Sequence, residues 1–182
     1  MKKIIFLIIA SLSINYANSQ ITKGFWMFGG TGRIISGSTT LLNTQYKSTA
    51  INLNPRVGYF FINKLSAGLR LNYDYQKTVD GGGFPRSSQA FGAGPFIRYY
   101  FLKNDSRINL ISELNGGFNK PTDSKNINYE FEVLGGIVLF LNSTVAVEIL
   151  PGYNSYTTTG AAESKSKNFI LNIGLQVHLQ KE

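Results

Sequence analysis

The chain has 182 residues, with 18 lysines and arginines, 10 acidic residues, one histidine and no cysteine. This length suits one domain with a substantial core. The lack of cysteine excludes disulfides, a lipid anchor on a cysteine and cysteine-based zinc sites. A net positive charge would suit nucleic acid, but the lysines fall in predicted loops, turns and element ends and form no basic stripe. We therefore expect no nucleic-acid partner.

Residues 1–19 have the pattern of a secretory signal peptide. Two lysines at positions 2 and 3 precede an apolar run from Ile4 to Ala10, and the segment ends in the small-x-small triplet Ala17-Asn18-Ser19. An N-terminal membrane helix would need about 20 apolar residues, and serine interrupts this run too early. We expect residues 1–19 to be removed on export and residues 20–182 to form the mature domain.

From Ile21 onward the sequence alternates between apolar and polar residues, which is the pattern of strands with two different faces. The alternation predicts eight strands, in chain order around 26–34, 51–61, 65–76, 91–101, 108–114, 128–141, 145–153 and 169–179.

The predicted connections fall into two kinds. Short turns are expected near 62–64, 103–106 and 142–144, and longer polar loops near 35–47, 78–88, 118–127 and 155–167. Because the two kinds alternate along the chain, they should lie at opposite ends of the sheet. Pro55, Pro95 and Pro151 fall inside predicted strands, where a missing N–H should produce bulges or kinks.

A repeat of about 40 residues supports a sheet of hairpins, since PRVGYFF at 55–61 returns as PFIRYYF at 95–101. The apolar faces hold roughly six side chains per strand, too many for the interior of an eight-stranded barrel. Their natural solvent is lipid. Aromatic residues gather near the short turns and again higher on the strands, as two interfacial girdles would. A soluble periplasmic carrier with the apolar face inside is the alternative.

Three segments carry a family resemblance: PRVGYFFINKLSAGL, FGAGPFIRYYF and FEVLGGIVLFLNSTVAVE. They resemble the repeated hairpins of the Gram-negative outer-membrane beta-barrel domain family, similar to OmpA and OmpX in architecture. The resemblance implies an all-β fold, a closed eight-stranded antiparallel up-and-down transmembrane barrel. It also implies an outer-membrane location, with both termini in the periplasm and the long loops outside.

The end of the chain is similar to the C-terminal signal read by the barrel assembly machinery, polar-x-Gly-x-x-apolar-x-apolar. Here the matching residues are Asn172, Gly174, Val177 and Leu179. The terminal aromatic residue of that signal is absent, and Gln180-Lys181-Glu182 follow instead.

Charged residues on the strands fall on the polar parity, which predicts an ionic network across the lumen. Its members are Arg33, Arg56, Arg70, Arg98, Asp74, Glu113, Glu130, Glu132 and Glu148. Five of them, Arg56, Arg70, Arg98, Glu113 and Glu148, are expected at similar heights as one interleaved layer. The layer could fill and staple the barrel, act as a gate whose pairs exchange, or hold a proton or ligand.

An enzyme would need a nucleophile with a base, and the lone histidine, His178, is expected on the periplasmic rim. We expect no catalysis, no metal and no cofactor. The expected role is structural or interactive, with a narrow channel for small or hydrophobic compounds as the alternative. The expected partners are outer-membrane lipid and lipopolysaccharide, the barrel assembly machinery and an unidentified extracellular partner, and the chain is expected to be a monomer.

Overall fold

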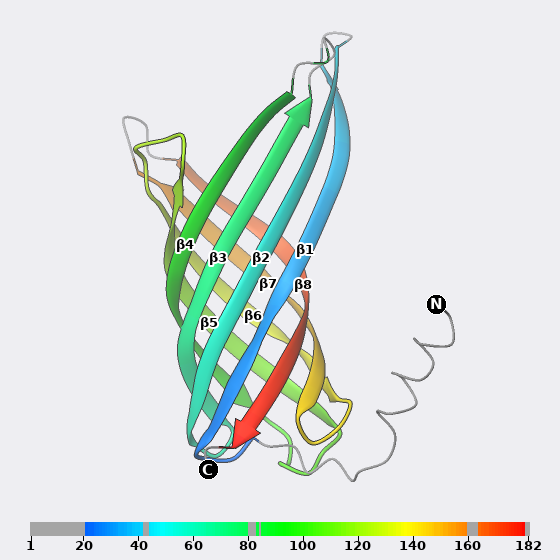
Figure 1. Ribbon diagram of the computed structural model, residues 1–182, viewed down its shortest axis with the longest axis vertical. Coiled ribbons are helices and arrows are strands. Elements are labelled where there is room, and N and C mark those ends of the chain that lie inside the picture. Colours follow the sequence, from blue (N-terminus) through cyan, green and yellow to red (C-terminus); the bar gives the residue numbers. More distant parts are fainter. Residues whose placement is uncertain (1–20, 42–43, 80–82, 84, 160–163, 181–182) are drawn as a thin grey trace, which may run out of the picture.

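The computed structural model describes residues 21–41, 44–79, 83, 85–159 and 164–180; the predicted signal peptide, 1–19, lies outside them. Eight antiparallel strands follow one another in chain order, and β1 pairs with β8 to close a barrel (Figure 1). The strands are β1 (Phe25–Leu41), β2 (Thr44–Ile62), β3 (Leu65–Val79), β4 (Pro85–Tyr100), β5 (Ile108–Pro121), β6 (Asn128–Phe140), β7 (Val145–Thr158) and β8 (Ser164–Gln180). The predicted fold class is confirmed.

The two ends of the barrel are named here by their connections. The turn end carries the connections at 63–64, 101–107 and 141–144, together with the start of β1 and the end of β8. The loop end carries the connections at 42–43, 80–84, 122–127 and 159–163. Among the described residues no helix is long and apolar enough to cross a membrane.

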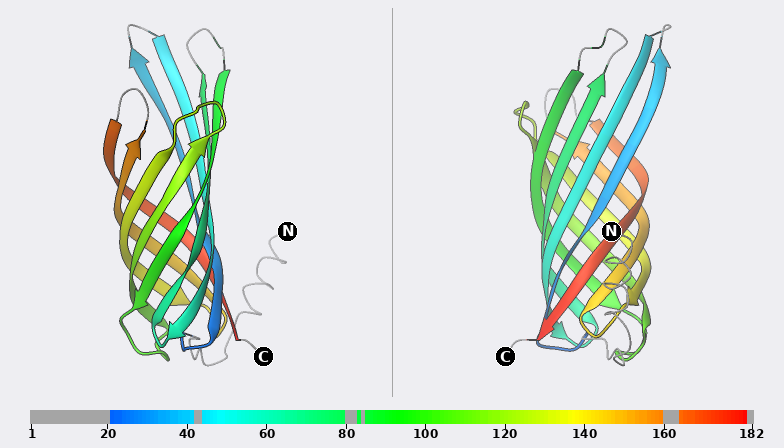
Figure 2. Two further views of the ribbon diagram at one scale, coloured as in Figure 1. Left: turned by 90° about the vertical axis from the view of Figure 1, so that its left-hand side faces the viewer. Right: turned by 45° about the vertical axis from the view of Figure 1, so that its right-hand side comes forward.

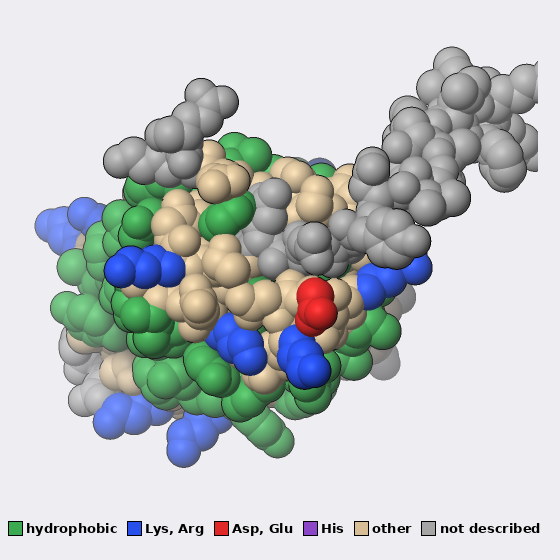
Figure 3. Space-filling model, turned by 90° about the horizontal axis from the view of Figure 1, so that it is seen from below, with side chains coloured by type: hydrophobic (Ala, Val, Ile, Leu, Met, Phe, Trp, Pro, Cys, Tyr) green, Lys and Arg blue, Asp and Glu red, His purple; other side chains and the backbone are tan. Residues whose placement is uncertain are grey.

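The apolar parity faces outward on every strand. Leu69, Tyr153 and Phe169 are 61%, 66% and 66% exposed, and large hydrophobic side chains on all eight strands are also exposed. Viewed from the turn end, hydrophobic side chains surround the molecule, with basic side chains near the rim (Figure 3). A soluble carrier would bury these residues inside, so that alternative is wrong.

The four predicted long loops are in large part strand. β1 runs on to Leu41 and β2 begins at Thr44, within the loop expected at 35–47, and the other three loops are shortened in the same way. Figure 2 shows β1–β4 rising beyond β5–β8 at this end. The apolar alternation fades where both faces of a hairpin are exposed, although the backbone pairing continues. The sequence pattern therefore predicts strand ends that come before the real ones.

The three prolines leave gaps in the ladder and no bulges. Leu53 pairs with Tyr73 and Arg56 with Arg70, so the ladder beside Pro55 is interrupted without a change of register. The same interruption occurs at Pro95 between β4 and β5, and at Pro151 between β6 and β7. The described register shift between β2 and β3 lies instead at Phe60/Ile62. Each proline remains paired with the neighbouring strand on its other side. The strands therefore accommodate the prolines without an inserted residue.

Candidate functional site

The lumen is closed at the turn end by a hydrophobic plug, which consists of Ile21, Met27, Phe60, Tyr100 and Phe140, all fully buried. The chain before β1 helps to seal it, because the Ile21 carbonyl accepts a 2.9 Å hydrogen bond from the Lys64 amide. His178 lies within this plug, with ring centroids 5.5 Å from Phe140 and 5.6 Å from Phe60. The expectation of a rim histidine is therefore wrong.

The sequence contains a signal for this plug that the alternation rule passes over. At the turn end the apolar residues occupy both parities, as in Tyr59-Phe60-Phe61, Tyr99-Tyr100-Phe101 and Leu139-Phe140-Leu141. The middle residue of each triplet points into the lumen and is buried. Apolar residues on both faces mark the point where a strand meets lipid outside and a packed core inside.

Above the plug lies a four-charge cluster of Arg56, Arg98, Glu113 and Glu148, each at most 5% exposed. Arg56 Nη1 donates to both Glu113 oxygens at 2.9 and 2.7 Å, and its Nη2 lies 3.3 Å from Glu148. Arg98 also contacts both carboxylates, through Nε to Glu113 at 2.5 Å and Nη1 to Glu148 at 2.8 Å. Two arginines and two glutamates thus alternate in a ring with balanced charge.

Polar side chains tie this ring to the plug. The Gln176 side-chain amide donates a hydrogen bond to Glu148. Its oxygen accepts a hydrogen bond from the Tyr100 hydroxyl at 2.8 Å and lies 3.0 Å from His178 Nε2. The Arg56 guanidinium lies 6.0 Å from the centre of the Phe96 ring, within reach of a cation–π contact. Such extra partners offset the desolvation cost that buried ions carry.

Arg70 belongs to a separate three-charge cluster with Glu130 and Glu132. It bonds to Glu130 Oε2 at 3.0 Å and also to Glu132. Arg56 and Arg70 are paired residues on β2 and β3. Their guanidiniums nevertheless bind different carboxylates, since the four-charge ring is already balanced. The expectation of a single layer that includes Arg70 is therefore wrong.

Asparagines surround the three-charge cluster. Asn72 donates to Glu130 at 3.0 Å, Asn115 to Glu132 at 3.0 Å, and Asn154 to both glutamates at 2.6 and 3.1 Å. These amides were not among the predicted site residues. The sequence places these asparagines at inward-facing strand positions, which could have identified them. The prediction selected only charged residues at such positions.

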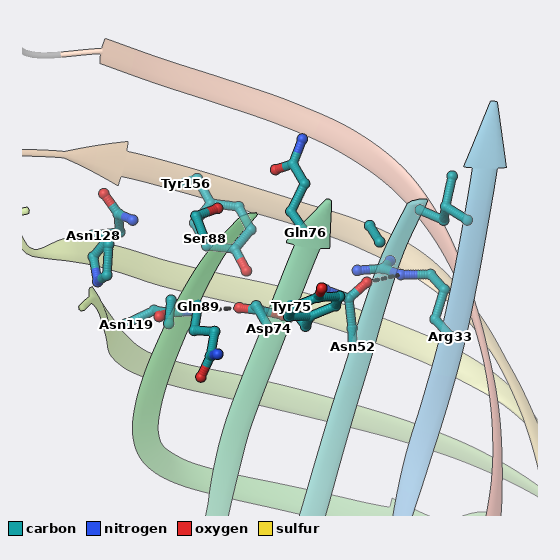
Figure 4. Close-up of a pocket in the computed structure, with 14 residues that line it drawn as sticks. Arg33, Asn52, Asp74, Tyr75, Gln76, Ser88, Gln89, Asn119, Asn128 and Tyr156 are labelled. Carbon is teal, nitrogen blue, oxygen red and sulfur yellow. Dashed lines mark hydrogen bonds between the residues drawn. The ribbon is translucent and has the colours of Figure 1, made fainter. Parts of the chain in front are cut away.

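The outermost polar layer is an amide cluster of Arg33, Asn52, Asp74 and Asn119. Arg33 Nε donates to Asn52 at 3.1 Å, Asn52 donates to Asp74 at 2.5 Å, and Asn119 donates to the other Asp74 oxygen. Arg33 and Asp74 are thus linked through an amide. These residues line a cavity of about 380 Å³ near the loop end, together with Tyr156 and Gln89 (Figure 4).

The barrel seam next to this cavity is only partly paired. β1 pairs with β8 from Phe25 to Gly32, and from Arg33 onward it pairs with β2 alone. The matching part of β8, from Ser164 to Asn172, pairs only with β7. Unpaired backbone is costly in lipid unless it borders water or protein. On the β1 side of the seam, Arg33 and Ile35 border the cavity.

The residues of the predicted assembly signal lie on β8, where Gly174, Val177 and Leu179 pair with β1 and Asn172 lies just beyond the paired part. Asn172 is 4% exposed and points inward, whereas Leu179 is 47% exposed on the outer face. Their recognition by assembly machinery stays a prediction. Among the described residues no group of three or more potential ligands from His, Cys, Asp and Glu could hold a metal ion.

Two solved structures align with this barrel over most of both chains. The outer membrane protein OprG from Pseudomonas aeruginosa aligns with a TM-score of 0.57 at 12% identity, covering 91% of this chain and 100% of that one. Neisserial surface protein A (NspA) aligns with a TM-score of 0.53 at 18% identity, covering 85% and 97%. The chain has the fold of these eight-stranded outer-membrane barrels. No family model and no curated protein match the sequence.

Proposed function

We propose that the protein is a non-enzymatic barrel of the outer membrane, with both termini in the periplasm and the loop end outside. In this proposal its role is structural or interactive, and an extracellular partner binds at the loop end. The observation that supports it is the combination of an apolar outer face with a lumen filled by the plug and the ionic clusters. His178 is fully buried between the rings of Phe60 and Phe140, out of contact with solvent, which supports a non-enzymatic role.

Heat modifiability tests the membrane-barrel proposal. The mature chain is refolded in detergent or lipid, and its gel mobility is compared with and without boiling. A compact band that shifts on boiling, and that forms only with detergent or lipid, is the expected result. Folding in plain buffer without a shift would contradict it, since the outward apolar face could not then be facing lipid. Sedimentation or cross-linking of the refolded barrel tests the expected monomer.

A narrow channel for small or hydrophobic compounds is the second candidate. The observation that favours it is the 380 Å³ cavity beside the open part of the β1–β8 seam. In vesicles, the wild-type barrel is expected to release little trapped solute because the lumen is crossed by ion pairs. Leakage that rises on neutralising Arg70 or Glu148 would favour a gated channel. Leakage that stays at the level of protein-free vesicles in both variants would favour the structural role.

A further inference from the structure

The strands separate their charged residues by type. All five acidic residues within strands, Asp74, Glu113, Glu130, Glu132 and Glu148, point into the lumen, where they bind arginine or amide groups. All five lysines within strands, Lys47, Lys77, Lys120, Lys165 and Lys167, occupy the outward parity and are exposed. The outer face of the described strands therefore carries positive charge and no acidic residue.

These five lysines, named here the lysine belt, lie towards the loop end, and on β3, β5 and β8 they lie next to an outward aromatic residue of the same strand. On β3, Lys77 stands two residues beyond Tyr75; on β5, Lys120 stands two beyond Phe118. β8 shows the same order in the opposite chain direction, with Lys167 two residues beyond Phe169. Outward aromatic residues mark the level of the lipid headgroups. Lys77 and Lys167 thus lie on the loop-end side of that level, whereas Lys120 lies at it, because its pairing partner on β4 is the outward Phe91.

Two places in the belt bring lysines close together. Lys77 is the partner of Thr49, and Lys47 is the partner of Val79, so the two lysines are diagonal neighbours on the outer face of β2 and β3. Diagonal positions of this kind are about 7–8 Å apart at Cα. Lys165 and Lys167 lie on the same face of β8, two residues apart. The Lys47–Lys77 pair can place two ammonium groups around one phosphate.

We propose that the lysine belt binds the phosphate groups of the outer-leaflet lipid, with Lys47 and Lys77 forming its main site. The proposal rests on the proposed function, because it needs the loop end to be at the outer surface of a membrane. Charge complementarity supports a phosphorylated lipid: the belt offers ammonium groups on the same outer face as exposed aromatic residues such as Phe118 and Phe169. The bound lipid would contact β2 and β3 at the base of the part of β1–β4 that rises beyond the other strands.

The test compares Lys47→Gln/Lys77→Gln with Lys23→Gln/Lys103→Gln, which removes the same charge at the turn end. Barrels refolded in detergent are titrated with lipid A carrying two phosphates and with lipid A carrying none, and bound lipid is counted by native mass spectrometry. At about 1 kcal/mol per lysine, the belt variant should bind the phosphorylated lipid about thirtyfold more weakly. The turn-end variant should stay within about threefold of wild type.

Either of two results would overturn the proposal: equal losses in the two variants, or equal binding of the two lipids by the wild-type barrel. Heat-shifted gel bands verify that each variant is folded before titration. They also separate the two levels of inference, since a chain that never yields a heat-shifted band contradicts the membrane barrel itself. A folded barrel with unchanged binding contradicts only the lipid site.

Discussion

Arginine and lysine have different places in this barrel for a physical reason. The planar guanidinium can bind two carboxylates at once and is weakly hydrated, whereas the ammonium group of lysine is strongly hydrated. Arg56 and Arg98 each contact both Glu113 and Glu148 in a space without bulk water. Lysine could not supply the donors that this ring uses, and on the outer face its ammonium group remains in water or among headgroups.

Neutralising Glu113 should destabilise the barrel strongly. Glu113→Gln leaves Arg56 and Arg98 sharing a single carboxylate, and both guanidiniums remain buried. Breaking a buried pair in this way typically costs about 3–5 kcal/mol. Urea unfolding in lipid vesicles, followed by tryptophan fluorescence, measures the free energy of unfolding.

Asp105→Asn in the 101–107 turn provides the control, because it also removes one carboxylate but from an exposed turn with no ion pair in the described contacts. It should change the free energy of unfolding by less than about 0.5 kcal/mol. If Glu113→Gln were equally mild, the four-charge cluster would contribute little to stability.

Two glycines that lie close together on the neighbouring strands β4 and β5 should respond differently to alanine. A Cβ on Gly94 would lie within 1.8 Å of the Gly116 carbonyl oxygen, whereas a Cβ on Gly116 meets no atom within 4 Å. Gly94→Ala must push the strands apart at the point where Pro95 already interrupts the ladder. We expect a loss of about 1–3 kcal/mol for Gly94→Ala and little change for Gly116→Ala. The same urea titration decides, and equal losses would contradict the close approach.

At the scale of the strands, the sequence predicts the features that follow from having lipid on one face of the sheet and a polar lumen on the other. Strand number and outward residues follow from alternation, because lipid outside and a polar lumen inside demand different side chains at successive positions. The upper part of each hairpin loses this signal, as in Ser36 to Thr40, where threonine and serine suit water on both faces. The partners of Arg70 could not be predicted either, because they depend on how the inward side chains share a crowded lumen.

The seam between β1 and β8 gives a prediction for a pair of strands. Phe28 and Val177 are paired, so Phe28→Cys/Val177→Cys should form a disulfide on mild oxidation. Ile34 and Leu171 would be the partners six residues further up if the register continued, but there each strand pairs only with its other neighbour. Ile34→Cys/Leu171→Cys should remain reduced. The natural chain has no cysteine, so the gel shift of each variant reports its own pair.

Fast cross-linking of both pairs would mean that the seam closes along its whole length. In that case the cavity beside Arg33 would be reached only from the loop end. Cross-linking of the lower pair alone would support a seam open towards the outer half of the barrel.

At the scale of the whole molecule, the lumen changes character along the barrel: hydrophobic plug, balanced four-charge ring, three-charge cluster, then amides around a cavity. Polarity increases from the turn end to the loop end, and the cavity lies at the polar end. Sequence reasoning could predict that the strand arginines and acidic residues face inward, because they alternate with apolar side chains that are too many to fit inside the barrel. It could not predict the plug, because residues such as Phe60 and Tyr100 lie on the parity assigned to polar groups.

The orientation proposed for the barrel in cells can be tested with peptide tags at its two ends. A peptide tag inserted after Ser124, in the 122–127 connection, should be labelled by antibody on intact cells, because the loop end faces outward in the proposed orientation. The same tag inserted after Asp105, in the 101–107 turn, should be labelled only after the outer membrane is permeabilised. Asp105 is exposed, and Ser124 is half-buried between the exposed Asp123 and Lys125, so a tag should disturb the strands little at either site. Labelling of the Asp105 tag alone on intact cells would reverse the orientation and place the lysine belt in the periplasm, away from the outer leaflet that it is proposed to bind.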